Sequence, residues 1–248
     1  MGRDLALHSG LPVTLAYAPT LSIIIPALEV DRELRRCVDS IRILCSDPSR
    51  CEIVLVVPSR CIEEAQSGFP EEKVVGECFP NIYGAMNDGV SRSCGRYLYF
   101  LGKDDVVLPL LVDAIEVLSN QSPDVVFCDV YWGERGIYSG KPSKLKIIGK
   151  NLCHQGIIYS RQTILKYGPY NRRMKVQADQ LVNTKILWDR KSVKNFVYLD
   201  KPLAWYSGTG YSSSVRDRLF CRLHPLVLEK YVGAWAACLL RLYRRLKS

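Results

Sequence analysis

Two adjacent carboxylates follow one of the most apolar runs in this 248-residue chain. Asp104 and Asp105 stand just after residues 96–101, a run that predicts a buried strand. Neighbouring carboxylates repel each other and add nothing to a core, so a cation is expected beside them. A hard divalent ion such as Mg²⁺ or Mn²⁺, completed by phosphate oxygens, fits this chemistry. The alternative is a solvated turn in which one Asp caps the helix that starts near Pro109.

The composition favours an anionic partner without identifying it. The chain carries 34 basic and 25 acidic residues, a formal net charge of +9, and 48% of its residues are apolar. Nucleic acid, an anionic membrane face or a phosphorylated substrate would each suit that charge. The ten cysteines form no C-x-x-C pair and lie mostly in apolar runs. We therefore expect reduced thiols in a cytoplasmic protein.

The elements that must position the carboxylates alternate between strands and helices. Residues 21–26 and 52–57 are continuous apolar runs, and Pro26 and Pro58 stop them. The alternation predicts a single α/β domain with a mostly parallel central sheet and helices on both faces. Ligands of such sheets bind outside the carboxyl ends of the strands. One rim should therefore carry the candidate ligand-binding residues Pro26, Ala27, Ser59, Lys103, Asp104 and Asp105.

A longer block around the acidic pair resembles the family 2 glycosyltransferases, which have the GT-A (Rossmann-like) fold. From Ile82 the chain has Ile-Tyr-Gly-Ala-Met-Asn-Asp-Gly, then Gly-Arg-Tyr, an apolar strand and the two carboxylates. Residues 21–26 and 52–57 are similar to the first two strands of the family. Residues 153–159, 178–181 and 208–212 resemble features of its bacterial exopolysaccharide and lipopolysaccharide subgroup. The resemblance covers residues 21–215.

This resemblance implies an inverting, metal-dependent hexosyltransferase of cell-surface polysaccharide biosynthesis. The donor would be a nucleotide sugar, and the acceptor a hydroxyl of a glycan or a polyprenyl-linked molecule. Asp104 and Asp105 would hold Mg²⁺ or Mn²⁺ on the diphosphate. Asp179 matches the late acidic residue of the subgroup, which implies the role of general base. By its own sequence context Asp179 could equally be the N-cap of a helix over residues 178–188.

The remaining site residues that the resemblance implies would contact the donor. Tyr83 and Asn87 would line the donor pocket, and His154 would contact the diphosphate or the metal. Arg216, with Arg218, would neutralise the diphosphate. The alternatives are core packing for Tyr83, a hydrogen-bonded core position for His154, and a solvated charge for Arg216.

The chain departs from the family pattern at two positions. Gly102 stands where the family motif Asp-x-Asp-Asp often has its first acid, and Pro58 stands near a position that usually holds an Asp. Proline cannot contact the base or ribose as that Asp would. Nucleotide recognition must therefore differ, and uridine is only weakly preferred over guanosine. A catalytically impaired homologue that serves as a scaffold is an alternative.

The chain is expected to divide into three parts: an N-terminal arm at residues 1–20, a catalytic domain at 21–215 and a basic amphipathic helical segment at 216–248. The basic residues near the end of the chain indicate the last of these. A single helix from about Leu226 would present an apolar face, with basic residues at its end. Such a helix suits peripheral contact with an anionic membrane, or packing of its apolar face on the domain. We expect no signal peptide and no membrane-spanning run, and a location in the cytoplasm at the inner face of the plasma membrane.

Two other function classes fit the sequence less well. A nucleic-acid-binding protein would suit the charge, but the aromatic residues lie in predicted strands and helices and no basic-aromatic motif appears. We therefore expect no nucleic-acid partner. A nucleotidyltransferase would usually need a glycine-rich, basic loop after the first strand, and Pro26-Ala-Leu-Glu is not one.

Overall fold

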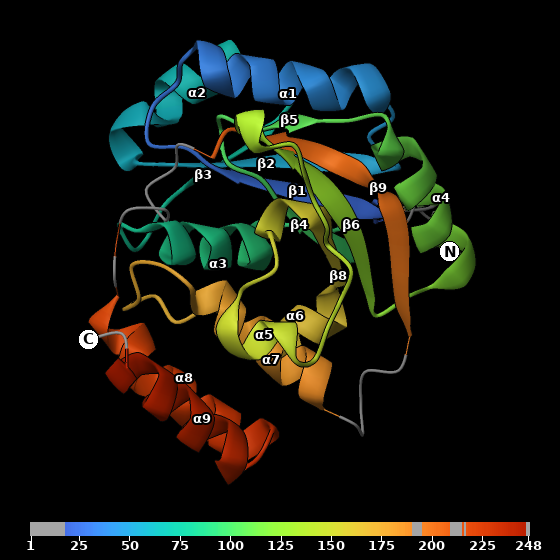
Figure 1. Ribbon diagram of the computed structural model, residues 1–248. Helices are drawn as coiled ribbons and strands as arrows, with labels where there is room; N and C mark the ends of the chain where they lie inside the picture. Colours follow the sequence, from blue (N-terminus) through green and yellow to red (C-terminus); the bar gives the residue numbers. More distant parts are fainter. Residues whose placement is uncertain (1–17, 190–194, 209–214, 216, 247–248) are drawn as a thin grey trace, which may run out of the picture.

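The computed structural model describes residues 18–189, 195–208, 215 and 217–246, and within these residues nine strands form one sheet (Figure 1). The strands are β1 (Leu21–Pro26), β2 (Cys51–Val57), β3 (Lys73–Gly76), β4 (Tyr97–Phe100), β5 (Val106–Val107), β6 (Val125–Trp132), β7 (Ile137–Tyr138), β8 (Ile157–Ser160) and β9 (Phe196–Tyr206). The helices are α1 (Arg32–Leu44), α2 (Ile62–Gly68), α3 (Ile82–Arg92), α4 (Leu110–Gln121), α5 (Lys146–Gly149), α6 (Arg161–Tyr167), α7 (Ala178–Trp188), α8 (Arg218–Tyr231) and α9 (Ala234–Leu246).

The sheet is mixed, and this corrects the expectation of a mostly parallel one. Its order is β3-β2-β1-β4-β8-β6-β9-β5, with β7 on β6. Strands β3, β2, β1 and β4 are parallel, but β8 runs antiparallel to both β4 and β6. The segment that precedes β8 lies at the carboxyl end of β4. Strand β8 therefore starts beside the end of β4 and runs in the opposite direction. The α/β class itself is confirmed.

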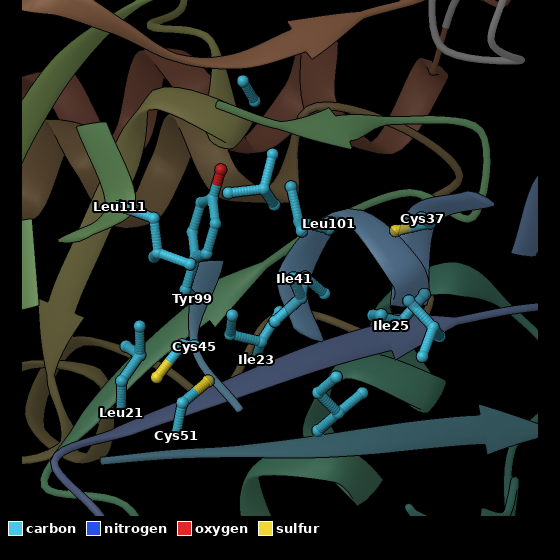
Figure 2. Close-up of a cluster of buried hydrophobic side chains, with 14 of the residues drawn as sticks. Leu21, Ile23, Ile25, Cys37, Ile41, Cys45, Cys51, Tyr99, Leu101 and Leu111 are labelled. Atoms are coloured by element: carbon cyan, nitrogen blue, oxygen red, sulfur yellow. The ribbon is translucent and has the colours of Figure 1, made fainter. Parts of the chain in front are cut away.

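Helices cover both faces of this sheet, because alternate strand residues point to opposite sides. Leu21, Ile23 and Ile25 of β1 face α1, where they meet Ile41 and other buried residues (Figure 2). Ile24 of β1 points to the opposite face of the sheet, where it packs with residues of α3, α6 and α7. All ten cysteines are free, and five of them are buried.

Gly89 allows α3 to approach the sheet closely. A Cβ at this position would lie 2.4 Å from Ile24 Cγ2 and 3.1 Å from Val56 Cγ2. Gly89→Ala gains up to about 1 kcal/mol of helix propensity, but the overpacking costs about 1–3 kcal/mol. We therefore expect a net loss of about 1 kcal/mol in the free energy of unfolding, measured by urea titration. Gly149→Ala is the control, because nothing lies within 4 Å of its added methyl; an equally stable Gly89→Ala would contradict this packing.

The C-terminal segment forms two helices, so the prediction of one helix from Leu226 is wrong. Helix α8 already starts at Arg218, where the Asp217 side chain accepts from the backbone N–H groups of Leu219 and Phe220. Gly233, at φ +129°, separates α8 from α9, and the two helices pack as a hairpin around Leu228. The predicted apolar face is therefore divided between a buried side and an exposed side.

None of the helices formed by the described residues is both long enough and apolar enough to cross a membrane. The predicted arm lies almost wholly outside the described residues, as do Arg216, Lys247 and most of the loop at 208–212.

Candidate functional site

The two carboxylates occupy a tight turn at the carboxyl end of β4. Asp105 Oδ2 accepts from the Gly102 N–H at 2.7 Å, and the Asp105 N–H donates back to the Gly102 carbonyl at 3.2 Å. A Cβ at position 102 would lie 2.7 Å from Asp104 Oδ1. Helix α4 has Pro109 as its N-cap and no side-chain cap. Neither Asp caps that helix, and a side chain at position 102 would crowd both carboxylates, since its Cβ would also lie 3.0 Å from Asp105 Oδ2.

Asp105 has the character of a group prepared for a cation. Its side chain is fully buried, and burial, followed by the charge of Asp104, raises its pKa to about 7. Asp105 Oδ2 also accepts from Gln155 Nε2 at 3.0 Å, but buried Oδ1 has no hydrogen-bond partner. A buried acceptor without a donor is costly unless a ligand satisfies it. The orphaned oxygen and the raised pKa both fit a divalent cation.

The protein offers that cation only part of a coordination shell. Asp104 lies beside Asp105, and its Oδ2 accepts a hydrogen bond from Ser207 Oγ. Among the residues that the structure describes, no three His, Cys, Asp or Glu side chains gather closely enough to hold a metal by themselves. Such a donor set suits Mg²⁺ or Mn²⁺ completed by substrate phosphates and water.

The raised pKa of Asp105 predicts a stability change with pH in the metal-free protein. The unfolded chain, with a carboxyl pKa of 3.8, binds fewer protons between pH 4 and 7 than the folded one, so stability falls as pH rises through this range. Asp105→Asn removes this dependence. In EDTA, the advantage of Asp105→Asn over wild type in the free energy of unfolding should grow by about 3 kcal/mol from pH 5 to pH 8. Urea titrations at pH 5 and pH 8 measure this. A difference between Asp105→Asn and wild type that is the same at both pH values would contradict it.

A third carboxylate, Asp179 at the start of α7, accepts hydrogen bonds from two side chains. Its Oδ1 accepts from Tyr83 Oη at 3.0 Å, and its Oδ2 accepts from Asn151 Nδ2. The N-cap alternative for Asp179 is wrong, because the N-cap is Gln177, which makes no side-chain cap and has φ +66°. A left-handed conformation costs a non-glycine residue energy, and here it places Asp179 in the first turn, facing Tyr83.

One short segment, residues 151–155, hydrogen-bonds both to Asp179 and to Asp105 of the acidic pair. Asn151 binds Asp179, and Gln155 binds Asp105. Two tyrosines fix this segment: Tyr138 Oη donates to the Asn151 carbonyl at 2.6 Å, and Tyr99 Oη donates to the Gln155 carbonyl at 2.7 Å. Four residue steps span at most about 14 Å of backbone, so a single short segment contacts both Asp105 and Asp179.

His154, within that segment, is partly buried and packs among aromatic rings. Burial lowers the pKa of its imidazole. Its Nε2 lies 2.9 Å from Tyr170 Oη, and its ring stacks on Phe100 at 5.1 Å. Asn87 bonds both backbone groups of Tyr170, at 2.8 and 3.0 Å. In this structure His154 and Asn87 therefore hold the loop before α7.

The other residues predicted to bind the donor are Pro26, Ala27, Ser59, Lys103 and Arg216, and the first four lie near the carboxyl ends of β1, β2 and β4. Pro26 ends β1, and Ala27 donates its N–H to the Val56 carbonyl at 2.9 Å. Ser59 is exposed just after β2. Lys103 points to α1, where Asp31 and Glu33 pair with its ammonium. Arg216 is the residue that lies outside the described residues.

Three residues that touch the carboxylates were missed by the sequence analysis as individual candidates. Gln155 lies within residues 153–159, and the resemblance of that segment to the glycosyltransferase subgroup was the signal that could have identified it. Asn151 and Ser207 had no such signal. Both are ordinary polar residues far along the chain from their carboxylate partners.

Known proteins resemble this chain at both the sequence and the structural level, although no family model matches it. Glycosyltransferases of PGL/p-HBAD biosynthesis from Mycobacterium tuberculosis and Mycobacterium bovis are 31% identical over 223 residues, covering 84% of this chain and 85% of theirs.

Among solved structures, residues 1–349 of TarS from S. aureus in complex with UDP-GlcNAc give a TM-score of 0.66 at 15% identity. That match covers 86% of this chain and 67% of the TarS fragment; a second crystal structure of the same fragment is covered to 66%. The mannosyltransferase PcManGT from Pyrobaculum calidifontis, in complex with GDP-Man and Mn²⁺, gives a TM-score of 0.55 at 11% identity. This match covers 93% of this chain and 81% of that chain. At these identities the structural matches support the fold alone.

Proposed function

Because this chain belongs to the family 2 glycosyltransferases of the GT-A fold, we propose that it transfers a sugar from a nucleotide-sugar donor to an acceptor hydroxyl with inversion. The acceptor is a glycan or lipid-linked molecule of cell-surface glycan biosynthesis. The names of the mycobacterial relatives support that setting.

The observation that carries the proposal is the link between Asp105 and Asp179 through residues 151–155. A transferase of this kind needs one acidic group for the leaving diphosphate and one for the attacking hydroxyl. Here one segment positions both, and its ends are fixed by hydrogen bonds to Tyr99 and Tyr138. Fixed geometry of this sort contributes to catalysis by orienting the reacting groups.

Asp179 acts as the general base in this proposal. Each carboxylate oxygen has two lone pairs, so Asp179 can accept a further hydrogen bond from an acceptor hydroxyl beside those from Tyr83 and Asn151. The hydroxyl proton moves to Asp179, the oxygen bonds to the anomeric carbon, and the bond to the diphosphate breaks with its electron pair. Attack opposite the leaving group inverts the anomeric configuration.

Asp104 and Asp105 would hold Mg²⁺ or Mn²⁺, which supplies charge stabilisation to the leaving nucleoside diphosphate. The orphaned Asp105 Oδ1 supports this assignment. The structural neighbour PcManGT, solved in complex with GDP-Man and Mn²⁺, supports the same assignment. Pro26, Ala27, Ser59 and Arg216 are proposed to contact the donor.

The resemblance implied that Tyr83, Asn87 and His154 contact the donor, but their hydrogen bonds favour a different role. All three fix the base or the loop before it, so we assign them to positioning. Lys103, paired with Asp31 and Glu33, would support the turn that carries the acidic pair.

Peripheral membrane contact through α9 is a further part of the proposal. Trp235, Leu239 and Leu242 are each about half exposed there, and Arg241 and Arg245 are exposed among them. Exposed Trp and Leu with interspersed cations suit the surface of an anionic membrane. The contact would bring a lipid-linked acceptor and the site to the same surface.

A donor panel tests the proposed function. UDP-, GDP-, dTDP- and CMP-sugars, each with Mn²⁺, are added to the protein and the melting temperature is recorded. A donor at 100 times its Kd should stabilise the fold by about 2.7 kcal/mol. Stabilisation by one nucleotide class, lost in EDTA, is the expected result. No shift with any donor would contradict the proposal and favour an impaired scaffold.

A further inference from the structure

A groove of about 330 Å³ runs between α7 and α8. Ala178, Leu181, Val182 and Lys185 line it from α7, and this spacing of three and four residues is that of one helix face. From α8 the lining residues are Leu223, Leu226, Val227, Lys230 and Tyr231. The volume lies at the small end of the range for ligand sites.

Two lysines that influence each other electrostatically lie in this groove, whose lining is otherwise apolar apart from Asn171 and Tyr231. Lys185 is partly buried, and its ammonium donates to the Tyr167 carbonyl at 3.1 Å. Burial, and then the charge of Lys230, lowers the pKa of Lys185. The described lining contains no acidic residue, and no described ion pair includes either lysine.

This arrangement is complementary to an anion attached to an apolar chain. Two ammonium groups that repel each other beside apolar walls gain most from a shared anionic partner. The walls accept hydrocarbon but offer little to a sugar or a free inorganic ion. Leu226 is 56% exposed at the groove, so the apolar lining is open to a ligand from outside.

The groove also lies next to the exposed surface of the α8–α9 hairpin. Helix α8 forms one wall of the groove and also packs against α9, which carries Trp235, Leu239 and Leu242 (Figure 1). We propose that the groove binds a single anionic phospholipid, with its phosphate between Lys185 and Lys230 and the start of one acyl chain along Leu181, Val227 and Leu226. This lipid site goes beyond contact through α9, because it binds one molecule with defined partners.

Titration calorimetry with a short-chain lipid below its micelle concentration tests the site. Dihexanoyl phosphatidic acid should bind wild type, and Lys185→Gln/Lys230→Gln should weaken that binding about tenfold or more. The matched control, Lys141→Gln/Lys201→Gln, removes two exposed charges outside the groove and should leave it unchanged. Leu226→Asp, at an exposed position, should also weaken binding. Equal affinity in the groove double variant, or equally tight binding of dihexanoyl phosphatidylcholine or inorganic phosphate to wild type, would overturn the proposal.

Vesicle sedimentation separates a membrane lipid from the phosphate of a lipid-linked acceptor. Vesicles of phosphatidylcholine with phosphatidylglycerol should retain wild type and release the groove double variant, while pure phosphatidylcholine retains neither. If the double variant still sediments and only its KM for a lipid-phosphate acceptor rises, the membrane-lipid assignment is wrong. Donor-induced stabilisation should be the same in both proteins, so failure of the lipid site and failure of the transferase proposal give different results.

Discussion

Replacing Asp179 with Asn is expected to lower the rate of sugar transfer by about 10²–10⁴-fold, the usual contribution of a general base. Asn keeps the shape of the side chain, and its oxygen can still accept from Tyr83. It cannot take the proton of the acceptor hydroxyl. Transfer is measured at saturating donor and acceptor, because the loss should appear in kcat.

Donor binding gives the control for this variant. The groups proposed to hold the metal and diphosphate lie elsewhere, so Asp179→Asn should keep the donor-induced rise in melting temperature. Asp39→Asn, at an exposed position of α1, should transfer sugar at the wild-type rate. A loss smaller than about fivefold in Asp179→Asn would remove the base assignment.

Replacing Asp104 with Asn should weaken donor binding in Mn²⁺ by about tenfold or more, because a neutral amide is a poorer ligand for a hard cation. Asp104 lies at the surface of the turn, outside the core, so the free energy of unfolding should change by about 1 kcal/mol or less. The measurement is the donor-induced melting shift as a function of donor concentration.

Asp113→Asn provides the comparison, since it removes an equal charge from the exposed side of α4. Its donor affinity should match wild type. If Asp104→Asn binds donor in Mn²⁺ as tightly as Asp113→Asn does, Asp104 does not hold the metal.

Local signals in the sequence were sufficient for much of the fold. The strand at β1 and the helix at residues 178–188 were predicted with the bounds that the structure shows. Both depend on patterns within the segment itself, namely a buried apolar run ended by Pro26 and a helical run that ends at Trp188. The α/β class followed from their alternation.

The directions and breaks of other elements depend on contacts that a local pattern does not contain. The antiparallel direction of β8 depends on where residues 151–155 lie at the rim. The break between α8 and α9 depends on Gly233 and on the packing of Leu228 against α9. A periodic run of apolar residues looked continuous across that break.

The site shows the same division between local and distant information. Asp104 and Asp105 were visible because two carboxylates after a strand are unusual. Ser207 lies 103 residues from Asp104, and Asn151 lies 28 residues from Asp179. Only folding brings these partners together. The roles of all these residues in catalysis stay predictions.

The most direct measurement of the central claim is calorimetric titration of the nucleoside diphosphate of the preferred donor into wild-type protein, with Mn²⁺ and with excess EDTA. If Asp104 and Asp105 hold a metal on the diphosphate, binding should follow a one-to-one isotherm in Mn²⁺ and weaken about tenfold or more in EDTA. Equal affinity in the two buffers would contradict the assignment of the acidic pair, and with it the account of this site.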